Sequence, residues 1–414
     1  MAPNPAPPGH PPAPAAPAPA APVPAPPGHP PEPPTPWAVI AGGGTGGHLY
    51  PGLAVARELV ERGHDPASLH FVGARRGLEA STRALEGFPS TLLPGRGLHR
   101  DFSVRSMMAN IEALAGEAVA VAQALRLFGR WRPAVVMSLG GYASLPCVVA
   151  AACSGAPLVV VNVDAVPGTV NRLAGRVAKA CAVGAPGVRL PRAVFTGCPV
   201  RGAMAAVDRS EPGRRLARQR LGLPPDAMVV AVSGGSLGSL RVNRAVTELA
   251  ELWSERTDVA IRHVVGRRDW DQFQGPRPTG GLVYQRVRYE EDMAALYAAA
   301  DVAVQRAGAN TVAELALAGV PAVLVPLPGA PGDHQGANAR TMERAGAAVV
   351  VADADLDGDR LARELGPLLA DPAHLARMGA AAHTLGRPGA TAAVADLVER
   401  YARPRTGKAS ARAC

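Results

Sequence analysis

The sequence predicts an α/β protein with two Rossmann-like domains, each built on a parallel sheet, that face a central cleft. The first observation is a pair of glycine-rich turns, at residues 42–47 and 234–239, one in each half of the chain. Each turn follows a short apolar strand and precedes a helix. Glycine lets the backbone bend sharply and approach a ligand, and the free amides of the following helix attract anions. The duplication therefore indicates two phosphate-binding domains.

The second observation is an alternation of short apolar runs with longer helical patterns, which occurs twice along the chain. Such alternation is typical of crossover helices that connect the strands of a parallel sheet covered on both faces. The strands expected in the first sheet are 37–41, 68–72, 134–138, 158–163 and 193–195. Those expected in the second sheet are 228–233, 260–265, 302–306, 322–325 and 347–351.

The alternation restarts after residues 197–201, which places a domain boundary near Val200. We expect a first domain over residues 37–200, a second over 201–385, and a last helix within 386–402 that packs back on the first domain. The flanking segments differ in kind. Residues 1–36 are nearly all proline and alanine and predict a disordered extension without the regions of a secretion signal, and residues 403–414 form a basic tail.

Composition narrows the function classes. The chain has 414 residues, of which 48% are hydrophobic, enough for two buried cores. Its net charge of +9 favours anionic ligands or an anionic membrane surface, although many basic proteins simply have basic exteriors. An aromatic content of only 4% argues against nucleic acid as a partner. Five cysteines without a CxxC pair indicate reduced thiols in a cytoplasmic protein and no metal site.

An uncharged stretch at residues 143–161 is long enough to raise the question of a membrane span. Pro146, Gly155 and Pro157 divide it, however, so we expect a helix, a turn and a strand that are buried in the first domain.

Two motifs suggest ligands that their context disfavours. Gly42, Gly44 and Gly47 satisfy the GxGxxG pattern of dinucleotide sites, but the second strand ends without the acidic residue that would hold a ribose. Arg75 and Arg76 at that point leave NADP as an alternative. Residues 353–364 match the calcium loop of an EF-hand, but they follow an apolar strand instead of a helix. Aspartates that start a helix are the simpler explanation.

Three further segments carry candidate functional residues. His48 follows the first glycine turn, where a neutral imidazole could take a proton from a hydroxyl, or could serve only as a structural helix-terminal residue. Glu314 follows the turn at residues 306–311, where a carboxylate could bind ribose hydroxyls beside phosphate-binding amides, or could merely complement the helix dipole. The apolar helix that ends near Arg130 suits either contact with anionic lipid or ordinary packing on the sheet.

Several motifs in one order resemble the MurG glycosyltransferases, over residues 37–401. The matching segments are 44–54, 140–144, 197–201, 234–236, 309–314 and 335–338. The resemblance implies a GT-B fold and an inverting transfer of GlcNAc from UDP-GlcNAc to undecaprenyl-diphosphate-linked MurNAc pentapeptide. It also implies lipid II synthesis for peptidoglycan by a peripheral protein at the cytoplasmic face of the cell membrane.

The resemblance assigns roles by position, with no cofactor and no metal. His48 is the candidate base, Glu314 would hold the ribose, and Gln335 would recognise sugar hydroxyls. The other donor-side positions are Thr45, Gly46, Gly47, Asp164, Arg201, Ser236, Tyr289, the backbone at Glu290, Ala309, Asn310 and Thr311. The acceptor-side positions are His48, Gly141, Tyr142 and Ser144.

The chain departs from the family pattern at two places. Asp164 replaces an asparagine expected to contact the donor sugar, and Leu237 replaces a glutamine in the second glycine turn. A carboxylate only accepts hydrogen bonds, whereas an amide both donates and accepts. The segment around Asp164 therefore favours, as an alternative, a related enzyme that uses another UDP-sugar or acceptor. Two further alternatives are a UDP-sugar epimerase, which also has two such domains, and a UDP-sugar-binding protein without catalysis.

Overall fold

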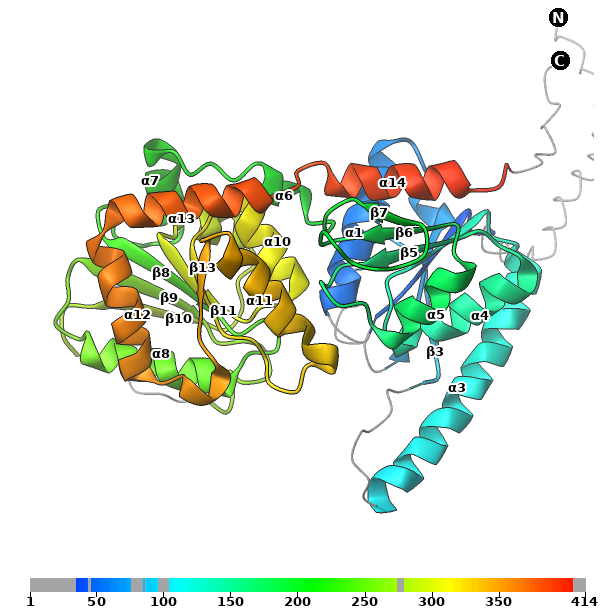
Figure 1. Cartoon of the computed structure of the whole chain (residues 1–414), viewed down its shortest axis with the longest axis horizontal. Helices are drawn as coiled ribbons and strands as arrows, with labels where there is room; N and C mark the ends of the chain where they lie inside the picture. The colour runs from blue at the N-terminus through cyan, green and yellow to red at the C-terminus, as the bar shows by residue number, and fades with distance from the viewer. Residues whose placement is uncertain are drawn as a thin grey trace, which may run out of the picture. The chain divides into compact units, whose positions relative to one another are not determined.

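The computed structural model describes residues 35–43, 46–75, 85, 87–95, 104–273 and 279–404, without the side chains of 104–112 (Figure 1). Two sheets organise these residues, and every strand pairing in them is parallel. The first sheet has the strand order β3-β2-β1-β4-β5-β6-β7, and the second has the order β10-β9-β8-β11-β12-β13. The predicted α/β fold with two Rossmann-like sheets is confirmed.

The first sheet and the helices around it come from both ends of the chain. Its strands are β1 (Ala38–Ala41), β2 (Leu69–Ala74), β3 (Ser90–Leu93), β4 (Val135–Ser138), β5 (Leu158–Asn162), β6 (Ala180–Val183) and β7 (Ala193–Phe195). Its helices are α1 (Gly46–Glu61), α3 (Val104–Trp131), α4 (Leu145–Ser154), α5 (Thr169–Val177) and the last helix, α14 (Ala390–Tyr401).

The second sheet is formed by the part of the chain between β7 and α14. Its strands are β8 (Met228–Ser233), β9 (Val259–Val264), β10 (Val283–Val287), β11 (Val302–Gln305), β12 (Ala322–Leu324) and β13 (Ala348–Val350). The helices of this part are α6 (Gly202–Ala205), α7 (Glu211–Arg220), α8 (Leu240–Leu252), α9 (Met293–Ala299), α10 (Ala309–Ala318), α11 (His334–Arg344), α12 (Gly358–Ala370) and α13 (Pro372–Leu385).

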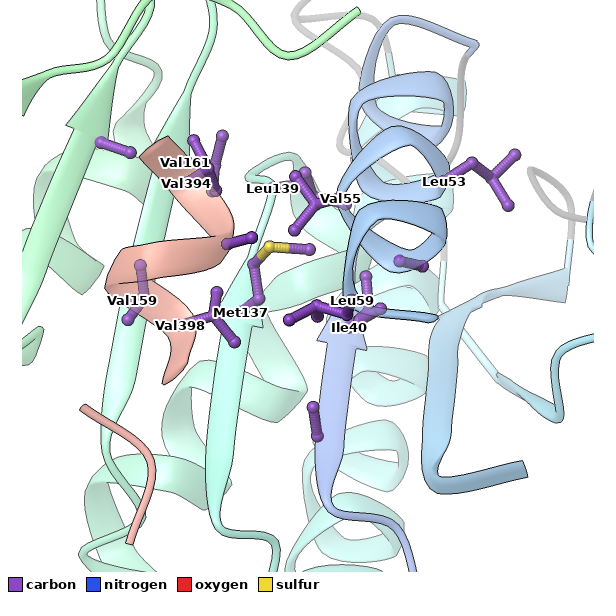
Figure 2. Packing of buried hydrophobic residues seen from close by; sticks show 14 of the residues in the cluster. Ile40, Leu53, Val55, Leu59, Met137, Leu139, Val159, Val161, Val394 and Val398 are labelled. Atoms are coloured by element: carbon purple, nitrogen blue, oxygen red, sulfur yellow. The ribbon is translucent and has the colours of Figure 1, made fainter. Parts of the chain in front are cut away.

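The last helix is part of the core of the first sheet. Figure 2 shows Val394 and Val398 of α14 among strand residues such as Met137 and Val159, all at most 1% exposed. Arg62, which follows α1, bonds both Asp396 and Glu399 of α14 at 2.7 Å. Burial of these valines contributes about 1.5–3 kcal/mol per side chain. Helix α14 thus packs on the sheet formed by the N-terminal half and completes its hydrophobic core.

The uncharged stretch at residues 143–161 forms a helix, a turn and a strand. Pro146 occupies the first turn of α4, where a missing amide hydrogen costs nothing, and Gly155 ends the helix with a φ of 66°. Strand β5 follows at Leu158 with all of its residues buried. Among the described residues, no helix is both long and apolar enough to cross a membrane.

Two of the three aspartates of the EF-hand pattern, and its glutamate, have structural partners. Asp357 caps α12 by accepting a hydrogen bond from the amide of Arg360 at 2.6 Å, as the helix-start interpretation predicts. Asp353 pairs with Arg306 at 2.7 Å, and Glu364 pairs with Arg360 at 2.7 Å. Within the described ranges, no three His, Cys, Asp or Glu side chains gather as metal ligands would.

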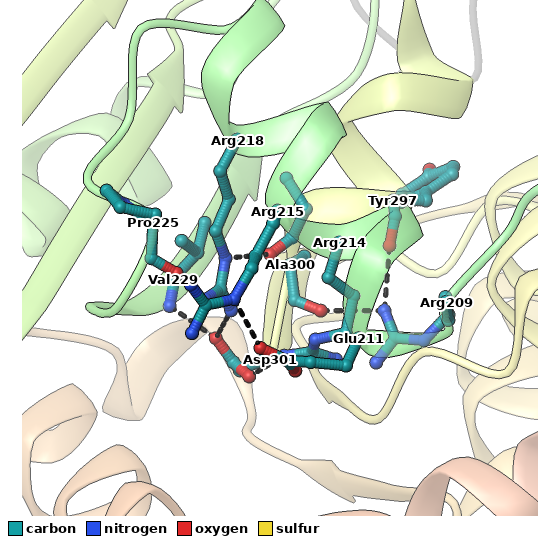
Figure 3. A network of polar contacts seen from close by, with 11 residues as sticks. Arg209, Glu211, Arg214, Arg215, Arg218, Pro225, Val229, Tyr297, Ala300 and Asp301 are labelled. Atoms are coloured by element: carbon teal, nitrogen blue, oxygen red, sulfur yellow. Dashed lines mark hydrogen bonds and ion pairs between the residues drawn. The ribbon is translucent and has the colours of Figure 1, made fainter.

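A buried carboxylate joins α7 to the second sheet (Figure 3). Asp301 precedes β11 and accepts from Arg214, from Arg218 at 2.8 Å and from the amide of Val229 at 2.5 Å. Arg209 donates to the carbonyl oxygens of Tyr297 and Ala300 at the end of α9 (2.7 and 2.6 Å), where the helix dipole favours positive charge. Burial and the neighbouring cations lower the pKa of Arg209 to about 9. These contacts hold α7 against α9.

Candidate functional site

The first glycine turn lies where β1 ends and α1 begins. Gly44 and Thr45 are outside the described residues, and Gly46 and Gly47 form the first positions of α1. The carbonyl oxygen of Gly47 accepts a hydrogen bond from the side chain of Asn310 at 3.4 Å. Asn310 belongs to α10, so this bond brings the first glycine turn beside the start of a helix from the second sheet.

His48 packs against a second turn of the first sheet. A Cβ atom added to Gly141, whose φ is +74°, would lie 3.4 Å from Cε1 of the His48 ring. Burial lowers the pKa of His48, the charge of Asp164 opposes that shift, and the charge of His334 adds to it. The imidazole is therefore neutral at neutral pH, as a proton acceptor must be.

The other acceptor-side positions form the turn beside His48. Gly141 precedes a short 3-10 helix, Tyr142–Ser144, which leads into α4. Ser144 is fully buried, and its hydroxyl donates to the carbonyl oxygen of Gly141 at 3.0 Å. Tyr142 is half-buried. Ser144 thus stabilises the turn, and its hydroxyl hydrogen is used in the bond to Gly141.

Asp164 follows β5 and contacts α11. Its carboxylate accepts from Asn338 at 3.0 Å and pairs with Nδ1 of His334 at 3.2 Å. Burial alone would raise the pKa of Asp164, but the hydrogen bonds from His334 and Asn338 and the charges of the two histidines lower it overall. The bond to Asp164 raises the pKa of His334 against its own burial. The residue that departs from the family pattern is therefore an ion-pair partner of His334.

The N-terminus of α10 carries the predicted phosphate-binding positions. Gly308 precedes the helix, and no side chain caps it. Ala309, Asn310 and Thr311 form its first turn and are half-buried. An uncapped helix start of this kind presents backbone amides and the positive end of the helix dipole to an anion.

Glu314 lies one turn further along α10 in a buried polar cluster. One carboxylate oxygen pairs with Arg201 at 3.3 Å, and the other accepts from the hydroxyl of Tyr297 at 3.4 Å. The Tyr297 hydroxyl is also 3.2 Å from Gln305. Burial raises the pKa of Glu314, and Arg201 opposes the shift. The cluster brings two predicted donor residues, Arg201 and Glu314, into direct contact.

Tyr289 is joined to α1 by a residue that the sequence analysis missed. Its hydroxyl lies 2.9 Å from the hydroxyl of Tyr50, and the Arg267 guanidinium lies 3.9 Å from the centre of its ring. Arg201 lies 5.4 Å from the centre of the Tyr50 ring. Tyr50 could have been predicted as a site residue from its position on α1, two residues after His48.

The remaining donor positions are placed separately. The Glu290 side chain is buried and paired with Arg262 at 2.7 Å. Gln335 accepts from the amide of Leu327 at 3.0 Å. Ser236 is exposed in the second glycine turn, and Ser239, not Ser236, caps α8. No hydrogen bond or ion pair joins these three donor positions to the Arg201–Glu314 pair in the described part of the chain.

The domains of this chain match those of a known enzyme family. Residues 38–183 match the glycosyltransferase family 28 N-terminal domain, and residues 229–401 match the glycosyltransferase family 28 C-terminal domain. Two relatives are UDP-N-acetylglucosamine--N-acetylmuramyl-(pentapeptide) pyrophosphoryl-undecaprenol N-acetylglucosamine transferases. The one from Desulforudis audaxviator is 38% identical and covers 88% of this chain and 98% of its own. The one from Alkalilimnicola ehrlichii is 41% identical and covers 88% and 99%.

Solved structures agree with this assignment. The MurG crystal structure from Acinetobacter baumannii superposes with a TM-score of 0.67 at 26% identity, over 88% of this chain and 99% of that one. A complex of S. aureus MnaA with UDP has a TM-score of 0.59 at 12% identity, over 88% of this chain and 96% of that one, and shows only the shared GT-B fold. With family domains, relatives and fold in agreement, this chain belongs to the MurG family of glycosyltransferases, within glycosyltransferase family 28.

Proposed function

We propose that this chain transfers N-acetylglucosamine from UDP-GlcNAc to the N-acetylmuramyl sugar of an undecaprenyl-diphosphate-linked pentapeptide, which converts lipid I into lipid II. The names of the relatives support this reaction. The structural observation that carries the proposal is the uncapped start of α10, with Glu314 one turn further along the helix and paired with Arg201, and with Gly47 against Asn310. It combines an anion-binding helix start, a ribose-binding carboxylate and the glycine turn of the other sheet.

The donor would bind along α10. Backbone amides at Ala309, Asn310 and Thr311 meet the diphosphate, and Glu314 accepts the ribose hydroxyls once UDP draws it away from Arg201. Tyr289 flanks the uracil beside the backbone of Glu290. The remaining donor contacts are assigned to Thr45, Gly46, Gly47, Asp164, Ser236 and Gln335, of which Gln335 recognises the sugar hydroxyls.

The transfer step follows from the neutral state of His48. Its ring, or a water molecule that it holds, takes the proton of the acceptor C4 hydroxyl as that oxygen attacks the anomeric carbon of GlcNAc. The attack comes from the face opposite UDP, so the configuration inverts. The bond from the anomeric carbon to the β-phosphate oxygen breaks, and its electron pair leaves with UDP. Gly141, Tyr142 and Ser144 form the acceptor side.

Charge on the departing diphosphate is stabilised electrostatically. It grows beside the first glycine turn and the start of α10, whose uncapped backbone amides favour an anion. Because these donors are fixed by the fold, they need no reorganisation during the reaction. No metal and no cofactor is assigned a role in this proposal.

A peripheral position at the cytoplasmic face of the cell membrane completes the proposal, because the acceptor is a lipid. Helices α3 and α5 expose apolar side chains, among them Leu114 at 59% and Val177 at 52%. Exposed arginines on the same two helices, such as Arg126 and Arg176, suit anionic headgroups. Nucleic acid is not a partner in this proposal.

The reaction is tested with purified protein, labelled UDP-GlcNAc and lipid I, with UDP-GlcNAc alone as the control. The expected product is labelled lipid II. Isomerised UDP-sugar in the control would favour an epimerase, and UDP binding without any product would favour a protein that has lost catalysis. The His48→Ala variant should lose about 10²–10⁴-fold in kcat and keep its UDP affinity. Wild-type turnover in that variant would remove the base role.

Asp164 supports one second candidate, a related enzyme with a different UDP-sugar or acceptor. Its carboxylate stands where the family has an amide that contacts the donor sugar, and it is held in place by His334 and Asn338. A panel of UDP-hexoses and UDP-N-acetylhexosamines, each offered with lipid I, distinguishes the candidates. A faster rate with another sugar would replace GlcNAc in the proposal.

A further inference from the structure

We propose that Asn171, acting through Asn162, is a positioning residue that fixes both the turn under His48 and the loop that carries Asp164. Neither asparagine is assigned a contact with donor or acceptor. The proposal rests on the function proposed above, because it concerns the placement of the base in that reaction.

The first contact lies at the glycine turn after β4. Gly140 and Gly141 have φ angles of +85° and +74°, a region that favours glycine. A Cβ atom on Gly140 would lie 2.6 Å from Oδ1 of Asn171, and one on Gly141 would lie 3.4 Å from the His48 ring. The side chains of Asn171 and His48 therefore pack against consecutive residues of one turn. A displacement of the Asn171 side chain would therefore shift Gly140 and Gly141, and with them the surface against which His48 packs.

The second contact leads to Asp164. The Asn171 amide donates to Oδ1 of Asn162 at 3.0 Å, and the Asn162 amide donates to the backbone oxygen of Asp164 at 2.7 Å. Asn162 is the last residue of β5 and is 2% exposed, while Asn171 lies in the first turn of α5 and is 6% exposed. Two buried amides thus link the His48 turn to the loop that places the Asp164 carboxylate.

Stability alone does not account for asparagine at position 171. Its Oδ1 has no hydrogen-bond partner within the described residues, nor does the buried hydroxyl of Ser138 at the end of β4. A buried oxygen without a partner costs about 1–3 kcal/mol, which the one hydrogen bond from Asn171 to Asn162, worth about 0.5–1.5 kcal/mol net, offsets only in part. The asparagine is explained if its amide is needed to hold the glycine turn under His48 and the loop that carries Asp164. At such a site, a displacement of about 1 Å can lower the rate about 10²-fold.

The test compares Asn171→Ala, Asn162→Ala and the double variant with Thr247→Ala as a matched control. Thr247 is 5% exposed, and its hydroxyl donates to a backbone oxygen within α8 at 3.0 Å, so its loss also removes a buried polar contact. For each variant we would measure kcat, KM for both substrates, the pH dependence of kcat, UDP affinity and Tm. The lipid II assay above supplies the rates.

Each asparagine variant should lose about 10–100-fold in kcat, with UDP affinity within about twofold of wild type. The acidic midpoint of the kcat profile should move, because Asp164 and His48 no longer keep their separation. The double variant should be no slower than the slower single variant, since both act through one path. Thr247→Ala should lower Tm without moving the midpoint.

Other outcomes overturn the proposal. An unmoved midpoint in both asparagine variants, or losses that multiply in the double variant, would leave these residues with a structural role only. If His48→Ala keeps wild-type turnover, the proposed base fails and this proposal fails with it. If His48→Ala is inactive but the pH profile of kcat in Asn171→Ala matches that of wild type, the base role stands and only the positioning role of Asn171 is overturned.

Discussion

The hydroxyl groups of Tyr50 and Tyr289 lie 2.9 Å apart, although 239 positions separate the two residues in the chain. Tyr50 belongs to α1 of the first sheet, and Tyr289 follows β10 of the second. Arg201 lies over the Tyr50 ring and pairs with Glu314, so the tyrosine pair and the proposed ribose carboxylate share one arginine. A proposed acceptor-side helix thus contacts the proposed donor site directly.

We expect Tyr50→Phe to weaken UDP binding by about threefold to tenfold, because it removes one hydrogen bond worth about 1 kcal/mol that holds Tyr289. Titration calorimetry with UDP measures the change. Tyr401→Phe, on α14, is the control. Unchanged UDP affinity in Tyr50→Phe would mean that Tyr289 needs no support from α1.

Glu314→Ala should weaken UDP-GlcNAc binding by about tenfold or more, because hydrogen bonds to a charged group contribute about 1.5–3 kcal/mol. Calorimetry again provides the measurement, with exposed Glu343→Ala on α11 as the matched control. Equal affinities for the two variants would rule out Glu314 as the ribose ligand.

The Asp164–His334 pair makes stability depend on pH. Asp164 has a lowered pKa, so its contribution is present above its unfolded value of 3.8 and is lost as the pH falls through the folded value. His334 has a raised pKa, so its contribution is full below 6.5 and is lost as the pH rises through the folded value. The pair therefore stabilises the protein most between these two unfolded values.

Asp164→Asn should accordingly lower Tm most near pH 5–6 and less on either side, with a loss of about 1 kcal/mol for this partly exposed pair. Thermal unfolding of the wild type and of Asp164→Asn from pH 4 to pH 9 checks this. The charges of His48 and Asp333 also act on the pair, and both residues are present in the two proteins. A pH-independent difference between the two proteins would exclude the ion pair as its source.

Asp301→Asn should destabilise the protein by about 3–5 kcal/mol, because it leaves Arg214 and Arg218 buried without their counter-charge. The expected signature is a large drop in Tm, measured beside the exposed Asp226→Asn. If the two variants have the same Tm, the buried Asp301 is not what holds α7 to the second sheet.

The sequence predicted the elements whose pattern is local. Residues 228–233 were expected as a strand, and β8 has these limits because the run is apolar up to Ser233 and is followed by a glycine turn. Strands β3, β6 and β10 were missed, since β3 and β10 are only half-buried edge strands with polar residues and β6 consists mostly of small residues. Neither kind has the bulky apolar run that identifies a buried strand.

The candidate site divides in the same way. Local motifs made His48 and Glu314 candidates, because each lies beside a turn that can be predicted from neighbouring residues, and the family resemblance added Arg201. The sequence could not predict Tyr50 beside Tyr289 or His334 beside Asp164, because tertiary folding alone brings such distant positions together. The orientation of Asn171 toward Gly140 likewise depends on how α5 packs on its sheet.

The place of α14 in the core of the first sheet sets an order for folding during synthesis. Strands β1 to β7 leave the ribosome first, but the valines that cover them, at positions 394 and 398, follow only after the whole second sheet. The second sheet has all of its own strands and helices by residue 385, so it can close while the first still exposes an apolar face. The N-terminal half of this enzyme thus reaches its native packing only after translation has passed α14.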